Sequence, residues 1–198
     1  MFYKLLRMLV RLILQTVFRW RVRGLENLPA AGGLIIASNH ISNFDPPLIG
    51  CALPLTRRIH FMAKIELFKN PLFGRIIFAL GAFPVRRGLA DRTAIRTALA
   101  LLESGEVVGI FPEGTRSKSG TLGRAEPGMG MIAVKAGVPV VPAAITGTNQ
   151  IFSDGHFLPR FTVSFAAPVV VPPGRTDKEA VEYLNKRVIE EIARMLAE

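Results

Sequence analysis

His40 and Asp45 stand five residues apart in the stretch SNHISNFDPP (38–47), directly after the apolar run GLIIA. In a continuous helix this spacing would place the two side chains ~140° apart around the axis, so they would not meet. Asp45-Pro46, however, is typical of a helix start with Asp45 as the N-cap. A loop before that start would let the carboxylate reach one imidazole nitrogen and leave the other to take a proton from a hydroxyl. The alternative is a loop histidine beside a helix cap.

A second polar cluster, FPEGTRS (111–117), follows the apolar run VVGI. Gly114 permits a close backbone approach or a positive φ. Arg116 carries a planar guanidinium suited to phosphate, and Glu113 could accept a hydrogen bond from a hydroxyl or hold an arginine. Thr115 lies in the same turn. The alternative is a surface turn with a salt bridge.

Further cations stand at the ends of predicted strands. Arg86 and Arg87 follow GAFPV, and Lys64 ends HFMAK. Adjacent residues on a strand point to opposite faces, so we expect only one of the two arginines to enter a given site.

The elements that must position these clusters alternate along the chain. Strand patterns cover 33–38, 58–64, 82–87, 106–114, 138–146 and 160–171. Helix patterns begin near Pro46 and cover 66–80 with an interruption at Pro71, 91–105 with Asp91 as cap, 128–136, and the end of the chain after the capping box Thr176 to Glu179. The order predicts a single α/β domain, with a mostly parallel or mixed central sheet flanked by helices. Ligands in such sheets gather outside the carboxyl ends of the strands. We expect the phenylalanines of LFGRIIFALGAF to be mostly core.

The composition and charge exclude some classes of protein and favour others. The 198 residues are 49% hydrophobic, which excludes a disordered chain, and the formal net charge of +10 favours an anionic partner. Cys51 is the only cysteine, so no intramolecular disulfide is possible. The three histidines are scattered, and we expect no metal site.

The first 23 residues form a separate segment before the predicted domain of residues 24–198. Polar residues recur at positions 4, 7, 11, 15 and 19, which gives a helix one narrow polar stripe on an otherwise apolar surface. The longest uncharged stretch, Leu12 to Phe18, is far shorter than the ~20 residues that span a bilayer. We therefore expect an amphipathic helix in the membrane interface, with its basic stripe on lipid phosphates and its apolar face on acyl chains. The alternative is a helix packed on the protein's own core.

Four sequence blocks, NHISNFD, GAFPVRR, FPEGTRS and VPVVPA, occur in this order between Asn39 and Ala143. They resemble the blocks of the 1-acyl-sn-glycerol-3-phosphate acyltransferase family, within the glycerolipid acyltransferase superfamily. The resemblance implies an enzyme of phospholipid biosynthesis that moves a fatty acyl group from acyl-CoA or acyl carrier protein to the sn-2 hydroxyl of lysophosphatidic acid, giving phosphatidic acid. It implies no cofactor beyond the acyl thioester co-substrate, and a peripheral or monotopic position on the cytoplasmic face of the cell membrane.

The resemblance also implies residue roles. His40 resembles the general base and Asp45 its orienting partner. Glu113, Gly114 and Arg116 match the block that binds the glycerol phosphate acceptor, with Thr115 in the same block. Arg87 stands six residues after Gly81, where the family's phosphate ligand usually stands. Lys64 is added to the expected substrate-binding set as a cation at a strand end, and not from the resemblance.

Other functions compete with this one. The acceptor could be glycerol-3-phosphate or another lysophospholipid, and a thioesterase would use the same His and Asp with water. A non-catalytic basic protein on membranes or nucleic acid would account for the charge. Nucleic acid is disfavoured because the basic residues are spread out and lack the aromatic-basic motifs of RNA-binding sheets.

Overall fold

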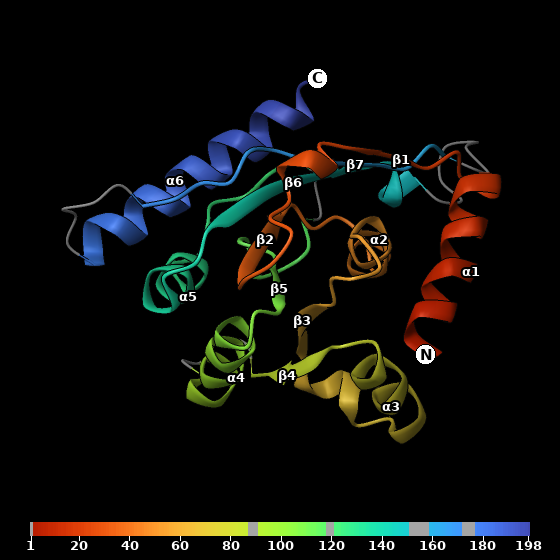
Figure 1. Cartoon of the computed structure of the whole chain (residues 1–198), viewed down its shortest axis with the longest axis horizontal. Helices are drawn as coiled ribbons and strands as arrows, with labels where there is room; N and C mark the ends of the chain where they lie inside the picture. The colour runs from red at the N-terminus through yellow and green to blue at the C-terminus, as the bar shows by residue number, and fades with distance from the viewer. Residues whose placement is uncertain (1, 87–90, 118–120, 151–158, 172–176) are drawn as a thin grey trace.

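The computed structural model describes residues 2–86, 91–117, 121–150, 159–171 and 177–198. Seven strands form one sheet in the order β1-β7-β6-β2-β5-β3-β4 (Figure 1). The strands are Arg21–Arg23 (β1), Leu34–Ser38 (β2), Ile59–Lys64 (β3), Phe83–Val85 (β4), Val107–Ile110 (β5), Val140–Thr146 (β6) and Thr162–Phe165 (β7). All neighbouring pairs are parallel except β6 and β7. The predicted α/β fold with a mostly parallel sheet is confirmed.

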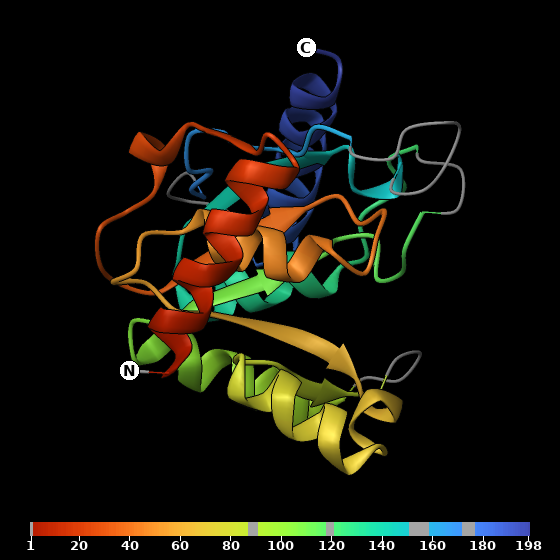
Figure 2. The same ribbon diagram turned by 90° about the vertical axis from the view of Figure 1, so that its right-hand side faces the viewer.

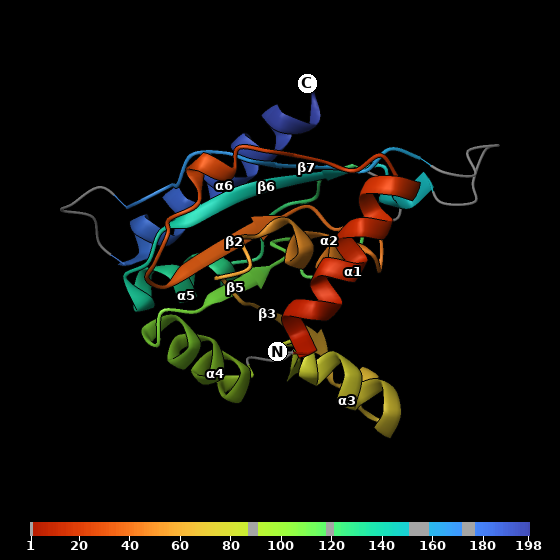
Figure 3. The same ribbon diagram turned by 45° about the vertical axis from the view of Figure 1, so that its right-hand side comes forward.

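Helices cover both faces of this sheet. They are Phe2–Val17 (α1), Asp45–Ala52 (α2), Pro71–Ala79 (α3), Arg92–Glu103 (α4), Gly128–Ala136 (α5) and Asp177–Leu196 (α6). Alternate residues of β2 separate two cores, because successive side chains of a strand point to opposite faces. Leu34 and Ile36 pack with α2 and with Leu14 of α1, whereas Ile35 and Ala37 pack with α4, α5 and α6. Figure 3 shows α1 and α2 on one side of the sheet and α4, α5 and α6 on the other.

Several helix boundaries have the predicted local cause. Asp91 caps α4, and its Oδ1 accepts hydrogen bonds from the backbone N–H groups of Thr93 and Ala94. The interruption expected at Pro71 is present, since a short 3-10 turn (η2, Ile65–Phe68) precedes α3 and Asn70 caps the helix that starts at Pro71. Thr176, the expected cap of the last helix, lies outside the described residues.

The sheet differs from the predicted one at one edge. The first segment contributes β1, which pairs in parallel with β7, so the helix at the start of the chain ends at Val17. A three-residue strand between a helix and a turn has too short a pattern to be recognised in a sequence.

Two residues of the basic stripe, Arg7 and Arg11, lie against the protein, which corrects the expectation that they face lipid phosphates, whereas Lys4 and Arg19 are exposed. Arg7 is 3% exposed and donates hydrogen bonds to the carbonyl oxygens of Leu53, Pro54 and Arg57. Arg11 donates to the carbonyl oxygens of Cys51 and Leu53. The last carbonyls of a helix lack intrahelical partners and carry partial negative charge. Arg11 therefore satisfies the carboxyl end of α2, Arg7 satisfies the carbonyls that follow it, and both tie α1 to this region.

The apolar face of α1 is consequently turned outward. Large side chains are exposed along the whole helix, namely Leu5, Met8, Leu9, Leu12, Ile13 and Val17. Among the described helices none has the length and apolar character needed to cross a bilayer.

The apolar residues of α3 are exposed as well. The expectation that LFGRIIFALGAF is mostly core is therefore wrong for this helix, in which only Gly74 is buried.

Replacing Arg7 with Ala is expected to lower the free energy of unfolding by about 2–4 kcal/mol, because carbonyls in the segment after α2 lose charge-assisted partners. Urea unfolding followed by circular dichroism measures this change. Lys4 is an exposed cation of the same helix. Lys4→Ala serves as the matched control and should stay within about 0.5 kcal/mol of the unaltered protein. Equal stability of the two variants would show that Arg7 does not hold α1 in place.

Candidate active site

Three parallel strands bring the predicted polar clusters to one edge of the sheet. β2 lies between β5 and β6, with Ala37 opposite Ile110 and Ser38 opposite Ala143. The residues that follow these strands therefore leave the sheet together at its carboxyl edge. His40 comes after β2 and FPEGTRS after β5, so these two clusters meet.

His40 and Asp45 are in direct contact. Nδ1 of His40 lies 2.8 Å from Oδ2 of Asp45, and both side chains are buried. The same Oδ2 accepts hydrogen bonds from the backbone N–H groups of Ile41 and Ser42, at 2.7 Å each. Asp45 is thus the first residue of α2 and not its N-cap, which is Phe44. Its carboxylate closes the loop behind it and does not cap the helix in front.

The second oxygen of Asp45 is held by Thr148. Oγ1 of Thr148 lies 2.6 Å from Oδ1, and Thr148 is buried in the 3-10 turn Thr148–Gln150 (η3) after β6. An ionised carboxylate can only accept hydrogen bonds, and the two backbone N–H groups on Oδ2 can only donate them. We therefore assign the proton of the neutral His40 ring to Nδ1, which leaves the lone pair on Nε2.

The imidazole rests on an aromatic stack. The rings of His40 and Phe111 are parallel within 15°, with centroids 3.9 Å apart, and Phe61 lies beyond Phe111 at 5.8 Å. Gly109 makes room for this stack, since a Cβ there would lie 2.2 Å from the Phe61 ring. The stack leaves His40 little freedom to tilt away from Asp45.

FPEGTRS also holds the backbone of His40. Oε1 of Glu113 accepts the His40 backbone N–H at 3.1 Å, and the Ser117 backbone N–H donates to the His40 carbonyl oxygen at 2.8 Å. Oε2 of Glu113 accepts the backbone N–H of Gly123 at 2.9 Å. Both oxygens of Glu113 are thus engaged by the protein's own backbone, which makes it a positioning residue for the histidine loop.

The other predicted site residues lie farther along the turns. Gly114 has a φ of +68°, and Gly114, Thr115 and Arg116 are all exposed. Lys64 is exposed at the carboxyl end of β3, with Nζ 3.9 Å from Oε2 of Glu66. Arg87 lies outside the described residues. Its neighbour Arg86 is exposed, and its backbone N–H donates to Asp91.

Two buried polar residues were missed by the sequence reasoning. The Asn39 side chain donates to the carbonyl oxygen of Ile145 at 2.9 Å and accepts its N–H at 2.8 Å, which fastens the end of β2 to β6. Thr148 is the second. Its only signal was its place in the polar run TGTN, directly after an apolar strand.

Other titratable groups lie apart from this arrangement. Burial lowers the pKa of His60, whose Nδ1 faces the carbonyl oxygen of Gly81. Burial raises the pKa of the Cys51 thiol, in the core beneath α1. Among the described residues no group of three or more His, Cys, Asp or Glu could hold a metal ion.

Comparisons with known proteins agree on one family. The sequence model of the family described as Acyltransferase matches residues 19–146. The 1-acyl-sn-glycerol-3-phosphate acyltransferase of Bacillus subtilis (strain 168) is 36% identical over 156 residues, which are 77% of each chain. A lyso-ornithine lipid O-acyltransferase of Pseudomonas aeruginosa is 37% identical over 139 residues, 70% of this chain and 51% of that protein. The crystal structure of the 1-acyl-sn-glycerophosphate acyltransferase PlsC from Thermotoga maritima has a TM-score of 0.70 at 31% identity, covering 97% of this chain and 82% of that one.

Replacing Thr148 with Val should lower kcat for acyl transfer by about 10- to 100-fold, because a buried carboxylate oxygen would lose its donor and Asp45 would no longer be held in one position. The KM values for the acyl donor and for the acceptor should change little, since Thr148 lies behind the His40–Asp45 pair. Thr148→Ser keeps the hydroxyl and should restore kcat to within about threefold. A folded Thr148→Val protein with an unaltered kcat would contradict this role.

Proposed function

We propose that this chain, which belongs to the acyltransferase family, transfers a fatty acyl group from an acyl thioester to the sn-2 hydroxyl of 1-acyl-glycerol-3-phosphate and so makes phosphatidic acid. The observation that carries the proposal is the buried His40–Asp45 contact, in which Asp45 leaves Nε2 of His40 as the base. The names of the Bacillus and Thermotoga relatives support the acceptor.

The chemistry follows from the orientation of the ring. Nε2 of His40 takes the proton of the acceptor hydroxyl as its oxygen attacks the thioester carbonyl carbon. The carbon–sulfur bond then breaks, and the imidazolium returns the proton to the departing thiolate. The negative Asp45 faces the imidazolium throughout and stabilises it. A base positioned in this way contributes typically 10²–10⁴-fold to the rate.

We assign recognition of the acceptor to arginine side chains outside the His40–Asp45 pair. In the proposal Arg116 and Arg87 bind the phosphate of the acceptor, since a guanidinium group matches phosphate oxygens with two parallel donors. Support for Arg116 comes from its exposed position three residues after Glu113, which holds the His40 backbone. Lys64, Gly114 and Thr115 complete the proposed binding surface. Arg87 enters on its sequence spacing alone.

The proposed setting is a membrane surface. The exposed apolar residues of α1 would enter the acyl-chain region on the cytoplasmic face of the cell membrane, where acceptor and product reside. Soluble acyl-CoA or acyl carrier protein would bring the donor. No metal or redox cofactor enters this mechanism.

A second acceptor is favoured by one relative. The Pseudomonas protein is 37% identical, and its name gives an ornithine lipid as the acceptor in place of a glycerol phosphate. Acylation of another lysolipid by the same dyad is therefore the alternative function. The two differ in whether the enzyme requires a phosphate on the acceptor.

Labelled acyl transfer in detergent–lipid micelles tests the proposal, with lysophosphatidic acid, glycerol-3-phosphate and lyso-ornithine lipid each offered with acyl-CoA and with acyl carrier protein. We expect labelled phosphatidic acid from lysophosphatidic acid, and a rate at least about 100-fold lower for His40→Ala. His60→Ala is the matched control and should keep its activity. Equal rates for His40→Ala and the unaltered enzyme would refute the mechanism. Label transferred only to lyso-ornithine lipid would select the alternative acceptor, and acyl release without any acceptor would indicate a thioesterase.

A further inference from the structure

The α3 helix presents apolar side chains to solvent on nearly all sides. Leu72 is 72% exposed and Phe78 is 65% exposed, and Phe73 and Ile76 are each close to half exposed. Leu67, in the preceding turn η2, is exposed as well. A soluble monomer rarely leaves such a contiguous apolar group uncovered, so this surface is built to meet something apolar.

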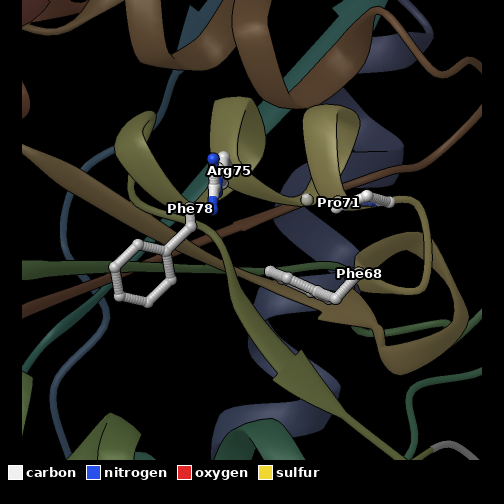
Figure 4. Close-up of a pocket in the computed structure, with 5 residues that line it drawn as sticks. Phe68, Pro71, Arg75 and Phe78 are labelled. Atoms are coloured by element: carbon white, nitrogen blue, oxygen red, sulfur yellow. The ribbon is translucent and has the colours of Figure 1, made fainter.

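An open cleft of about 300 Å³ lies within this surface, lined by Phe68, Pro71, Gly74, Arg75 and Phe78 (Figure 4). Gly74 allows α3 to pack closely on η2, since a Cβ there would lie 3.1 Å from Cα of Phe68. The lining is apolar except for the guanidinium group of Arg75. The cleft thus combines an apolar lining with one positive charge at its exposed side.

The excess of basic residues is concentrated in two segments of the chain, one of which contains α3. Residues 1–25 and 67–90 contain ten of the 25 basic residues and none of the 15 acidic ones. The remaining 15 basic residues balance the acidic residues, so these two segments carry the whole formal excess of +10. One segment contains α1 and the other contains α3, and both helices have extensive exposed apolar faces. Arg7 and Arg11 face the protein's own carbonyls, so the basic residues of these segments that are described as exposed are Lys4, Arg19, Arg21, Arg23, Lys69, Arg75 and Arg86.

The two helices are joined on the same side of the molecule. The guanidinium group of Arg58 lies 5.0 Å from the ring centroid of Tyr3 in α1 and donates a hydrogen bond to the carbonyl oxygen of Ala79 in α3 at 3.0 Å. Figure 2 shows both helices on the side that faces the viewer. Their exposed apolar faces can therefore meet one flat partner together.

We propose that the α3 surface, defined as Leu67, Lys69, Leu72, Phe73, Arg75, Ile76 and Phe78, is a second membrane-contact site that binds anionic phospholipid. Its apolar side chains enter the acyl-chain region, and Lys69 and Arg75 bind phosphate groups at the headgroup level. A bilayer matches both properties at once, since it offers a broad apolar layer beneath negative charge. A protein partner would need an apolar patch rimmed by acidic residues, and unaltered vesicle binding by the α3 variants would point to it.

The second contact gives the enzyme a fixed orientation, and this consequence rests on the proposed function. A single interfacial helix leaves a protein free to rotate about the helix axis. Contact through α3 removes that rotation and holds the carboxyl edge of the sheet, where His40 lies, at a constant height above the lipid. The acceptor hydroxyl can then reach Nε2 without leaving the membrane surface.

Vesicle co-sedimentation of the full chain tests this site. The probes are vesicles of phosphatidylcholine mixed with phosphatidylglycerol and vesicles of phosphatidylcholine alone. Leu72→Ser/Phe78→Ser should weaken binding to both by at least about tenfold. Lys69→Gln/Arg75→Gln should weaken binding to the anionic vesicles by about fivefold for each charge and leave binding to the neutral vesicles unaltered. Met131 and Val170 are exposed apolar residues outside α1 and α3. Met131→Ser/Val170→Ser is therefore the matched control and should bind as the unaltered protein does.

Substitutions are preferable to deletion here, because all four altered residues of the α3 surface are exposed and their loss should leave the fold intact. Unaltered vesicle binding by both α3 variants would overturn the proposal. So would a dimer that Leu72→Ser/Phe78→Ser dissociates without loss of vesicle binding, because the surface would then join two copies of the chain. Turnover of a short-chain, water-soluble lysophosphatidic acid separates this outcome from failure of the proposed function. Weakened vesicle binding in a protein without any such turnover would leave the membrane site standing and refute the function.

Discussion

The carboxylate of Asp45 is fully buried, and the proposed active site depends on the four hydrogen bonds that it accepts. A buried charge is very costly unless donors surround it. Here the donors come from the imidazole of His40, the backbone of Ile41 and Ser42, and the hydroxyl of Thr148. The same bonds that make the charge tolerable fix the direction of the histidine ring, so the stability of the loop and the orientation of the imidazole have one physical origin.

The parallel sheet supplies these donors from distant parts of the chain. Thr148 lies 103 residues after Asp45 and reaches it because β6 is paired with β2. Glu113 lies 73 residues after His40 and reaches its backbone because β5 is paired with β2 on the other side. Asn39 strengthens the first of these pairings through its two bonds to Ile145. The central position of β2 is therefore what converts three separate polar turns into one site.

The parts of this arrangement that are local in sequence could be predicted. Alternating strand and helix patterns gave the fold class, and the Asp-Pro step marked the start of α2 and hence the loop that lets His40 meet Asp45. Thr148 could not be predicted, since its role depends on strand adjacency that a single sequence does not reveal. Glu113 was expected to face a substrate or an arginine, and two backbone N–H groups engage it instead.

The helices α1 and α3 show a second limit of prediction from sequence, which concerns the partner that a helix face contacts. The spacing of Arg7 and Arg11 is the same whether they face lipid phosphates or the carbonyl end of another helix, so periodicity identified the stripe but not its partner. In α3 the apolar composition suggested core, because a sequence does not distinguish side chains that pack inside a protein from those that pack against something outside it. The role of Arg87 stays a prediction from its spacing.

The rate of acyl transfer by Asp45→Asn measures whether the buried charge of Asp45 supports proton transfer by His40. Asparagine keeps the shape of the side chain, its oxygen can accept from His40 and the loop, and the Thr148 hydroxyl can turn to accept from its amide. The substitution therefore removes the charge that faces the imidazolium and leaves the packing in place. We expect a folded protein with nearly unaltered KM values for donor and acceptor and a kcat at least about 100-fold lower. A kcat close to that of the unaltered enzyme would show that the buried charge of Asp45 plays no part in the proton transfer.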